Sequence, residues 1–315
     1  MDAPISRRSF IGASAAVSAA GMNAVARAGA APRRYQQGRS PWPISLDTAV
    51  IRPATLHEKI EAAAAAGFDG VEPWEGELTE YEEEGGDLEE LGARIADEGL
   101  TVPNVVALWN AIPENDEAWR ELEDTHRRRF EQAAKVGAAH IQAVASPARA
   151  WDEFDLGWAA ERYRDLLDMG REYGVIPALN FLQFFPHLQR LGTAVAIALD
   201  ADHPDACIVP DTFHMYVGGS SWKALRRLQP ELIAVFQIND APGEPARTEL
   251  EDEHRVYPGL GVLPLQDVLR DLQAIGYEGG VSLQLFNREY WEEEPKTAAR
   301  WGLEHTLEVI ETALS

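Results

Sequence analysis

Two residues with complementary chemistry stand three positions apart, where an apolar segment of the sequence ends. Asp211 can hold a proton or a cation, and His214 can exchange a proton near neutral pH. A carboxylate and an imidazole this close in sequence can reach one substrate or one metal ion. We therefore predict that Asp211 and His214 are catalytic. Glu72, which ends another apolar segment, is predicted to join them as a general base, as an acceptor for a substrate hydroxyl or as half of a salt bridge.

Other polar and aromatic residues follow apolar segments in the same way. The residues predicted to contact a substrate are Trp74, His187, Asp240, His254, Arg255 and Asn287. Tryptophan faces stack on sugar rings, although large aromatic side chains also fill the mouths of barrels. His187 could contact the substrate or pack as a ring, and His254 could bind an oxyanion or lie in solvent. Asp240 and Arg255 could instead pair with each other and order their loop.

These residues need a scaffold that brings the ends of many strands together. Short apolar segments alternate with longer segments whose apolar residues recur every three or four positions, the pattern of consecutive strand–helix units. Eight strands are predicted, at 44–48, 70–73, 101–107, 140–145, 176–181, 207–211, 233–238 and 280–286. Helices are predicted between them, among others at 56–66, 87–98, 117–136, 158–173 and 265–275.

Glycines mark the ends of several predicted helices. Gly67, Gly137, Gly174 and Gly276 each follow a helix and precede a strand, where a residue that accepts positive φ ends the helix. No G-x-G-x-x-G sequence follows the first strand, which argues against an open dinucleotide-binding sheet. We therefore predict an α/β fold, a single (β/α)8 TIM barrel over residues 44–315.

The N-terminal segment has the features of an export signal. Arg7 and Arg8 precede an Ala-rich stretch that ends at Ala28-Gly29-Ala30, the pattern of a twin-arginine signal peptide. The alternative is a disordered basic tail. We predict a signal peptide over 1–30, a linker over 31–43 and export to the periplasm or beyond the cell.

Charge and composition restrict the possible partners. The 315 residues include 52 acidic and 28 basic ones, a net charge of −24, which argues against binding to nucleic acid or to an anionic membrane surface. After residue 30 the sequence contains no apolar run long enough to span a membrane. The only cysteine, Cys207, lies in an apolar segment and is predicted to be in the core.

An ordered set of short motifs resembles a known family. The motifs are AAGFDGVE (65–72), DTFH (211–214), QINDAP (237–242), RVYPGLGV (255–262) and GYEGGVSLQLFN (276–287). Together they resemble the sugar phosphate isomerase/epimerase family, the xylose isomerase-like TIM barrels. The likeness covers nearly the whole chain after the signal and implies a metal-dependent barrel that acts on a sugar.

The resemblance also implies metal ligands, but this sequence departs from the family pattern. Family members hold a divalent metal with a glutamate, an aspartate, a histidine or related ligand, and a second glutamate. The matching positions here are Asn180, Asp211, Gln237 and Gln284. Amides supply no negative charge and accept no proton at working pH, so we expect at most one weakly held Mn²⁺ or Mg²⁺ ion and no other cofactor.

Two functions are compatible with these residues. The first is an exported isomerase/epimerase-like or lyase-like enzyme acting on a small-molecule carbohydrate, with a depleted metal site. The second is a catalytically silent sugar-binding barrel, because both family glutamates, which also move the proton, are amides here. Metal-dependent DNA-repair endonucleases share the fold, but the acidic charge and the altered metal positions argue against that activity.

Overall fold

A computed structural model describes residues 35–145 and 155–315. The signal peptide expected over 1–30 and residues 31–34 of the expected linker lie outside these residues. The strands are β1 (Ile44–Asp47), β2 (Gly70–Glu72), β3 (Asn104–Leu108), β4 (His140–Ala143), β5 (Ile176–Asn180), β6 (Ile208–Val209), β7 (Val235–Ile238) and β8 (Gly280–Leu283). The α-helices are α1 (Leu56–Ala66), α2 (Glu75–Glu83), α3 (Leu88–Asp97), α4 (Asp116–Lys135), α5 (Leu156–Tyr173), α6 (Leu191–Asp200), α7 (Thr212–Val217), α8 (Leu265–Ala274) and α9 (Pro295–Leu314).

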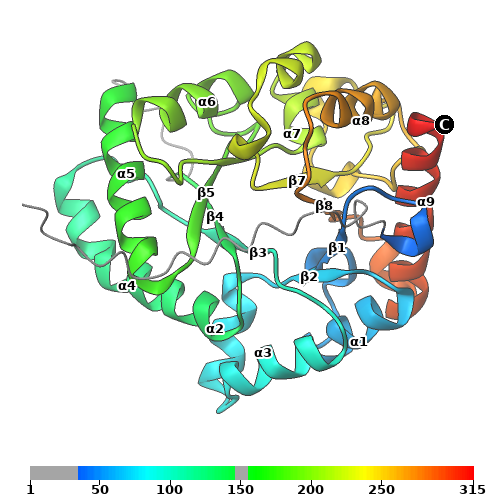
Figure 1. Ribbon diagram of the computed structural model, residues 1–315, viewed down its shortest axis with the longest axis horizontal. Helices are drawn as coiled ribbons and strands as arrows, with labels where there is room; N and C mark the ends of the chain where they lie inside the picture. Colours follow the sequence, from blue (N-terminus) through cyan, green and yellow to red (C-terminus); the bar gives the residue numbers. More distant parts are fainter. Residues whose placement is uncertain (1–34, 146–154) are drawn as a thin grey trace, which may run out of the picture. The chain divides into compact units, whose positions relative to one another are not determined.

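The strands form a closed parallel ring with the helices around it (Figure 1). Two four-stranded sheets, in the orders β2-β1-β8-β7 and β3-β4-β5-β6, make up most of the ring. Isolated parallel bridges close the ring: Gly70 of β2 pairs with Thr101, which precedes β3, and Ile208 of β6 pairs with Ile233, which precedes β7. The (β/α)8 TIM barrel predicted from the sequence is therefore confirmed.

All eight predicted strands are present with small shifts of their ends, and proline explains two of these shifts. β3 begins at Asn104 rather than at 101, directly after Pro103, and β6 ends at Val209, directly before Pro210. Proline has no N–H and cannot donate to a strand ladder. The strand pairs keep their parallel register, apart from a shift between Val105 and Leu108.

Local sequence signals set the helix ends. α1 begins with a capping box in which Thr55 accepts from the backbone of Glu58 and the Glu58 carboxylate accepts from the backbone of Thr55. α1 ends at Gly67, whose φ is 94°. Gly137, Gly174 and Gly276 also have positive φ, as their positions in the sequence predict.

The described part of the expected linker, 35–43, packs on the barrel. Trp42 is 1% exposed, and its Nε1 donates to the backbone oxygen of Tyr277 at 2.7 Å. Arg39 forms ion pairs with Glu304 and Glu311 of α9. Cys207 is buried in the core, as predicted. None of the described helices is long and apolar enough to cross a membrane.

Gly170, inside α5, tests how tightly the helices pack on the ring. A Cβ atom at Gly170 would lie 2.3 Å from the backbone oxygen of Val175, which cannot move freely. We expect Gly170→Ala to lower the free energy of unfolding by about 1–3 kcal/mol, measured by urea denaturation. Gly76→Ala in α2 is the control, because nothing lies within 4 Å of its Cβ position, and it should be neutral or stabilising. Equal effects of the two changes would contradict the packing.

Candidate functional site

The inner wall of the barrel is polar at the carboxyl ends of its strands. Gln142 on β4 and Gln237 on β7 bond across the barrel, with 2.9 Å between Oε1 of Gln142 and Nε2 of Gln237. Gln142 pairs in register with Ala178, so Asn180, two residues further along β5, also points inward. The same alternation turns inward the buried side chains of Ser45, Asp47, Glu72, Asp211, Ser282 and Gln284.

Arg255 lies at the centre of this polar space, and its side chain is fully buried. Its Nη1 donates hydrogen bonds to Oδ2 of Asp211 at 2.7 Å and to Oε1 of Gln284 at 3.1 Å. Its Nη2 donates to Nε2 of His214 at 2.9 Å and to Oδ1 of Asp252 at 2.7 Å. Its Nε donates to the same Oδ1 of Asp252 at 3.1 Å. A guanidinium has five N–H groups, and these contacts use all of them.

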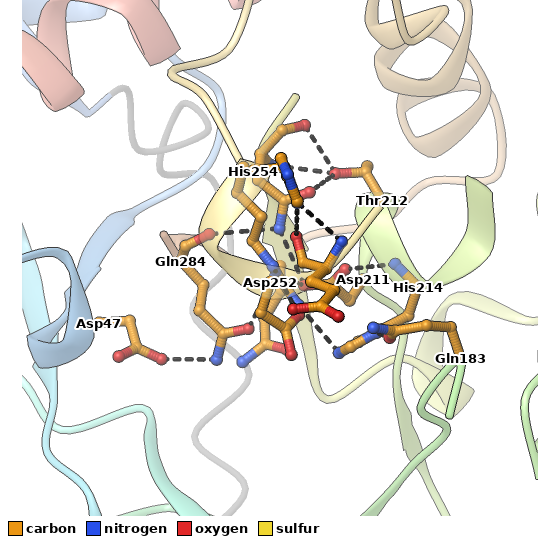
Figure 2. A network of polar contacts seen from close by, with 12 residues as sticks. Asp47, Gln183, Asp211, Thr212, His214, Asp252, His254 and Gln284 are labelled. Carbon is orange, nitrogen blue, oxygen red and sulfur yellow. Dashed lines mark hydrogen bonds and ion pairs between the residues drawn. The ribbon is translucent and has the colours of Figure 1, made fainter. Parts of the chain in front are cut away.

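The network extends on both sides of Asp211. Figure 2 shows Asp47 and Gln284 on one side of Asp211, and His214 and Gln183 on the other. Because Arg255 can only donate, Nε2 of His214 must accept, which leaves the proton on Nδ1 facing Oε1 of Gln183. Burial lowers the pKa of His214. His214 is therefore a neutral ring held in one tautomer.

Asp211 and Asp252 differ in how their charges are compensated. Oδ1 of Asp211 accepts from the backbone N–H of His214 at 2.8 Å, and its Oδ2 accepts from Asn239 at 2.9 Å as well as from Arg255. Burial, the largest single effect, raises the pKa of Asp252. The positive charge of Arg255, the charge of neighbouring groups and the hydrogen bonds from Arg255 and Gln183 together bring the pKa below its ordinary value. Asp252 is therefore an ionised carboxylate.

Asp47 connects the network to the aromatic wall of the site. Its Oδ2 accepts from Nε2 of Gln284 at 2.7 Å, and its Oδ1 accepts from Nε1 of Trp74 at 2.8 Å. Burial raises the pKa of Asp47 to about 6, although these hydrogen bonds lower it. The Trp74 ring meets Phe286 edge to face at 5.7 Å, and the guanidinium of Arg255 lies 5.1 Å from the same Phe286 ring.

A cavity of ≈ 50 Å³ lies against this network. Its polar wall consists of Gln142, His214, Asp252, Arg255 and Gln284. Its apolar wall consists of Trp74, Ala107, Trp109, Val144, Leu182, Phe184 and Phe286. A space of this size holds one or two water molecules, so a sugar ring would enter only if exposed side chains such as Trp109 or Phe184 moved. A wider groove of ≈ 1090 Å³ adjoins it and shares Trp74 and Trp109.

The loop that carries Arg255 is held in place by Asp240. The Asp240 carboxylate accepts from the backbone N–H groups of Ala241, Gly259, Gly261 and Leu263. Gly261 is required there, because a Cβ atom would lie 2.3 Å from Oδ1 of Asp240. Asn287 donates to the backbone oxygen of Arg255 at 3.0 Å. Asp240 and Arg255 therefore do not pair with each other, and Asp240 and Asn287 position the loop.

Glu72 lies in the barrel interior but makes no bond to the Arg255 network. Its Oε1 accepts from Oγ of Ser45 at 2.7 Å, and its Oε2 accepts from Nδ2 of Asn104 at 3.1 Å. Ser45 lies near the amino end of β1 and Asn104 begins β3, whereas Glu72 ends β2. Burial and the negative charge of Asp47 raise the pKa of Glu72 to about 7.

The two loop histidines predicted to bind substrate lie outside the cavity wall. Nδ1 of His254 accepts from the backbone N–H of Glu251 at 2.9 Å, so this ring caps its own short turn, η6 (Asp252–His254). His187 is half-buried in the loop after β5.

Two of the residues at metal positions keep unpaired polar atoms. Within the described residues, Nδ2 and Oδ1 of Asn180 have no hydrogen-bond partner, and neither has Oε1 of Gln237. Both side chains are fully buried. Burying such atoms unpaired is costly, so a water molecule is expected beside them. Neither side chain lines the cavity.

Gln183, Asn239 and Asp252 belong to the network although no role was predicted for them from the sequence. Gln183 fixes the ring of His214, Asn239 donates to Asp211, and Asp252 pairs with Arg255. The pairing of Asp252 with Arg255 could have been predicted, because two residues that are one helical turn apart can bring their side chains together. The other two are neutral amides in loops, and nothing in their spacing distinguishes them.

The four positions that the resemblance assigns to a metal do not form a site that fits a divalent cation. Three of them are amides, and both oxygens of the fourth, Asp211, already accept hydrogen bonds. Oε1 of Gln284 is turned to Arg255. Across residues 35–145 and 155–315, no three His, Cys, Asp or Glu side chains are grouped so as to hold a metal. A hard divalent cation needs several anionic oxygens, which this arrangement does not offer.

The buried ion pair of Arg255 should dominate the stability of this region. Arg255→Met leaves Asp211 and Asp252 without a counter-charge, and we expect the free energy of unfolding to fall by about 3–5 kcal/mol. Adding Asp211→Asn should recover part of the loss. Urea denaturation measures both, with exposed Arg288→Met as the control. A loss as small as that of a surface ion pair would contradict the arrangement.

Glu72 should make stability depend on pH. The native carboxyl keeps its proton up to about pH 7, whereas the unfolded one loses it near its ordinary value of 4.5. The native state therefore binds more protons in this window, and the free energy of unfolding falls as pH rises through it. We expect Glu72→Gln to flatten this profile and to add on the order of 2 kcal/mol at pH 8. Denaturation at several pH values measures this, and an unchanged slope, equal to that of exposed Glu89→Gln, would refute it.

The sequence of the chain is similar to one protein family and to several named enzymes. A family model described as xylose isomerase-like TIM barrel matches residues 60–309. Inosose isomerase of Bacillus licheniformis is 27% identical over 200 residues, which cover 62% of this chain and 71% of that protein. The 3-dehydroshikimate dehydratase of Pseudomonas putida is 26% identical over 254 residues, which cover 80% of this chain and only 39% of that longer protein.

A solved structure supports the same fold. The IolI protein with a bound zinc atom superposes with a TM-score of 0.79 at 23% identity, covering 87% of this chain and 99% of that chain. At this identity the likeness shows the fold alone. Because the family model covers most of the sequence, the chain belongs to the family of xylose isomerase-like TIM barrels.

Proposed function

We propose that the protein is an exported enzyme of the isomerase/epimerase or lyase type that acts on a small sugar or sugar derivative. One observation carries the proposal: a cavity at the carboxyl ends of the strands has aromatic side chains on one wall and amide and charged groups on the other. Sugars have apolar ring faces and hydroxyls that both donate and accept, and this combination matches them.

Two unpaired amides that lie outside the cavity wall would also suit a polyhydroxylated ligand that reached them. Asn180 offers a free donor and a free acceptor, and Gln237 offers a free acceptor. A hydroxyl group can satisfy either kind of atom, so a sugar would remove the cost of burying them unpaired. A purely apolar ligand would leave that cost in place.

The relatives indicate the reaction class. Their names specify the isomerisation of inosose and the dehydration of 3-dehydroshikimate, and both reaction types move a proton next to a carbonyl group. Asp252 is the ionised carboxylate on the cavity wall, whereas Nε2 of His214 already accepts from Arg255. We assign Asp252 the role of the base and His214 that of a neighbouring polar contact.

Proton exchange tests the proposed reaction class. The protein is incubated with inosose or 3-dehydroshikimate in D₂O, and deuterium uptake beside the carbonyl is followed by NMR. We expect uptake that Asp252→Asn slows by at least about 100-fold, while exposed Glu253→Gln leaves it unchanged. Ligand binding without any uptake would favour the silent sugar-binding barrel, which the amides at positions 180 and 284 support. No binding of either compound or of related sugars would refute the proposal.

Trp74 tests the aromatic wall. Its ring lines both the cavity and the adjoining groove, so Trp74→Ala removes a stacking face. We expect affinity for a bound sugar to fall by about tenfold, measured by calorimetry. Trp301→Ala is the matched control, because Trp301 lies on α9 at 43% exposure. Equal affinities of the two variants would exclude Trp74 from the binding surface.

Export rests on the N-terminal sequence. Arg7 and Arg8 before an Ala-rich stretch support a twin-arginine signal. Replacing both arginines with lysine should leave the protein in the cytoplasm, which cell fractionation and immunoblotting measure. Unchanged export of the double variant would contradict the twin-arginine route.

A further inference from the structure

We propose that the wide groove beside the cavity is a subsite for a second sugar ring, so that the ligand is a neutral glycoside of at least two rings. The inference rests on the proposed function, because one ring of the glycoside has to reach the cavity, and it adds the class of the sugar. It is carried by the place of the groove, its size, its aromatic side chains and its charges.

The groove begins at the mouth of the cavity and continues between α1 and α2. Trp74 and Trp109 line both spaces, and they follow β2 and β3 at the carboxyl ends of these strands. Beyond them the groove is lined by the start of α1, including His57, and by the face of α2 that carries Glu80 and Tyr81. A ligand in contact with both tryptophans can therefore extend from the cavity into the groove.

The groove, unlike the cavity, has the volume of a ligand site. Sites for small molecules commonly enclose about 300–1,000 Å³, whereas the cavity measures ≈ 50 Å³ and the groove ≈ 1090 Å³. The helix packing explains this space, because α1 packs mainly against α9 and α2 packs against α4. A single sugar ring would use only part of the groove, and a second ring would extend along it.

Aromatic rings line the groove at two separate places. Trp109 lies where the groove meets the cavity and is 37% exposed. Tyr81 lines the groove beyond the cavity, and His57 meets its ring edge to face at 5.5 Å. The Tyr81 ring also lies against Gly86, where a Cβ atom would be 2.3 Å from Cε1 of the ring. Aromatic faces stack on sugar rings, so two such places match two rings.

The floor of the groove is fixed before a ligand binds. Lys59 of α1 is buried and forms an ion pair with Glu77 of α2. Glu77 also accepts from Oγ1 of Thr48 at 2.6 Å and from the backbone N–H of Trp74 at 2.8 Å. Glu77 thereby joins α1, the segment after β1 and the start of α2. A preformed site of this kind loses little conformational freedom on binding.

The charges of the groove suit a neutral sugar better than an acidic one. Two ion pairs compensate the other Lys and Glu side chains of the groove, Lys59–Glu77 and Arg129–Glu75. Among residues 35–145 and 155–315, the charged groove residues without an ion-pair partner are Arg52, Glu80 and Glu84. A phosphate or carboxylate would meet two carboxylates and a single guanidinium. Hydroxyl groups can donate to the carboxylates and accept from the guanidinium.

Ligand length and charge test the proposal on the unmodified full chain. Glucose, four neutral disaccharides (cellobiose, maltose, lactose and sucrose) and the acidic digalacturonate are each titrated, and their affinities are measured by calorimetry. We expect at least one neutral disaccharide to bind about tenfold more tightly than glucose and than digalacturonate. A glucose affinity that no disaccharide exceeds, the absence of disaccharide binding, or a preference for digalacturonate would overturn the proposal.

Filling the groove tests where the second ring lies. Gly76 lines the groove as the second residue of α2, and nothing lies within 4 Å of its Cβ position. Gly76→Phe therefore places a ring in the groove without a clash, and we expect it to abolish the tenfold advantage of the disaccharide over glucose. Gly192→Phe is the matched control, because Gly192 is the second residue of α6 and its Cβ position is equally open. An advantage that survives Gly76→Phe would overturn the proposal.

Tyr81→Ala is a second variant that does not depend on how Gly76→Phe folds. It removes the ring that lies beyond the cavity, so we expect the disaccharide to lose about tenfold in affinity, whereas Trp301→Ala on α9 leaves it unchanged. Equal affinities of the two variants would count against the subsite.

The outcomes separate this proposal from the proposed reaction, because binding needs no turnover. Disaccharide binding that Gly76→Phe weakens, without deuterium uptake beside a carbonyl, would support the subsite and contradict the reaction. Deuterium uptake into inosose or 3-dehydroshikimate, without any disaccharide advantage in calorimetry, would support the reaction and overturn the subsite.

Discussion

The site depends on one buried interaction, the contact of Arg255 with Asp211 inside the barrel. Neither side chain is exposed, and a buried carboxylate without a partner would be too costly to remain ionised. The other contacts can be understood from this pair. Asp240 and Gly261 shape the loop that delivers the arginine, and Asn287 fixes its backbone.

The barrel provides the polar space in which this pair can form. Strand alternation turns one face of every strand inward, and here that face carries amides and carboxylates at the carboxyl ends. Gln142 and Gln237 bond across the ring, while Asn180 keeps free polar atoms. The interior therefore contains the fully bonded network around Arg255 and, apart from it, buried amide atoms of Asn180 and Gln237 that have no hydrogen-bond partner in the described part of the chain.

The sequence predicts the scaffold better than it predicts the roles of the side chains. Periodicity and terminal glycines such as Gly67 and Gly174 locate strands and helices, because these signals act within a few residues. Asp211 and His214 are likewise close in sequence, three positions apart, and they are in contact in the structure. The central position of Arg255 arises from a loop fold set by distant backbone contacts, and no local pattern encodes it.

Glu72 is a second residue whose role the sequence does not predict. It ends a strand, as a catalytic carboxylate would, but its carboxylate turns toward Ser45 and Asn104. The direction of a side chain at a strand end depends on the neighbouring strands, which sequence spacing does not give. Asp252 shows the opposite situation. Its position in a loop does not indicate a role, and its place in the site comes from its ion pair with Arg255.

The central claim is that Asp211 is bonded to Arg255 and that, among the residues the structure describes, the amides around it leave no site for a divalent metal. Its most direct test is a crystal structure of the unmodified protein grown with Zn²⁺ or Mn²⁺, with anomalous scattering measured at the metal edge. The account predicts no anomalous peak within bonding distance of Asp211, and the Arg255 guanidinium in contact with that carboxylate. A metal peak bonded to Asp211, with Arg255 displaced from it, would contradict the account.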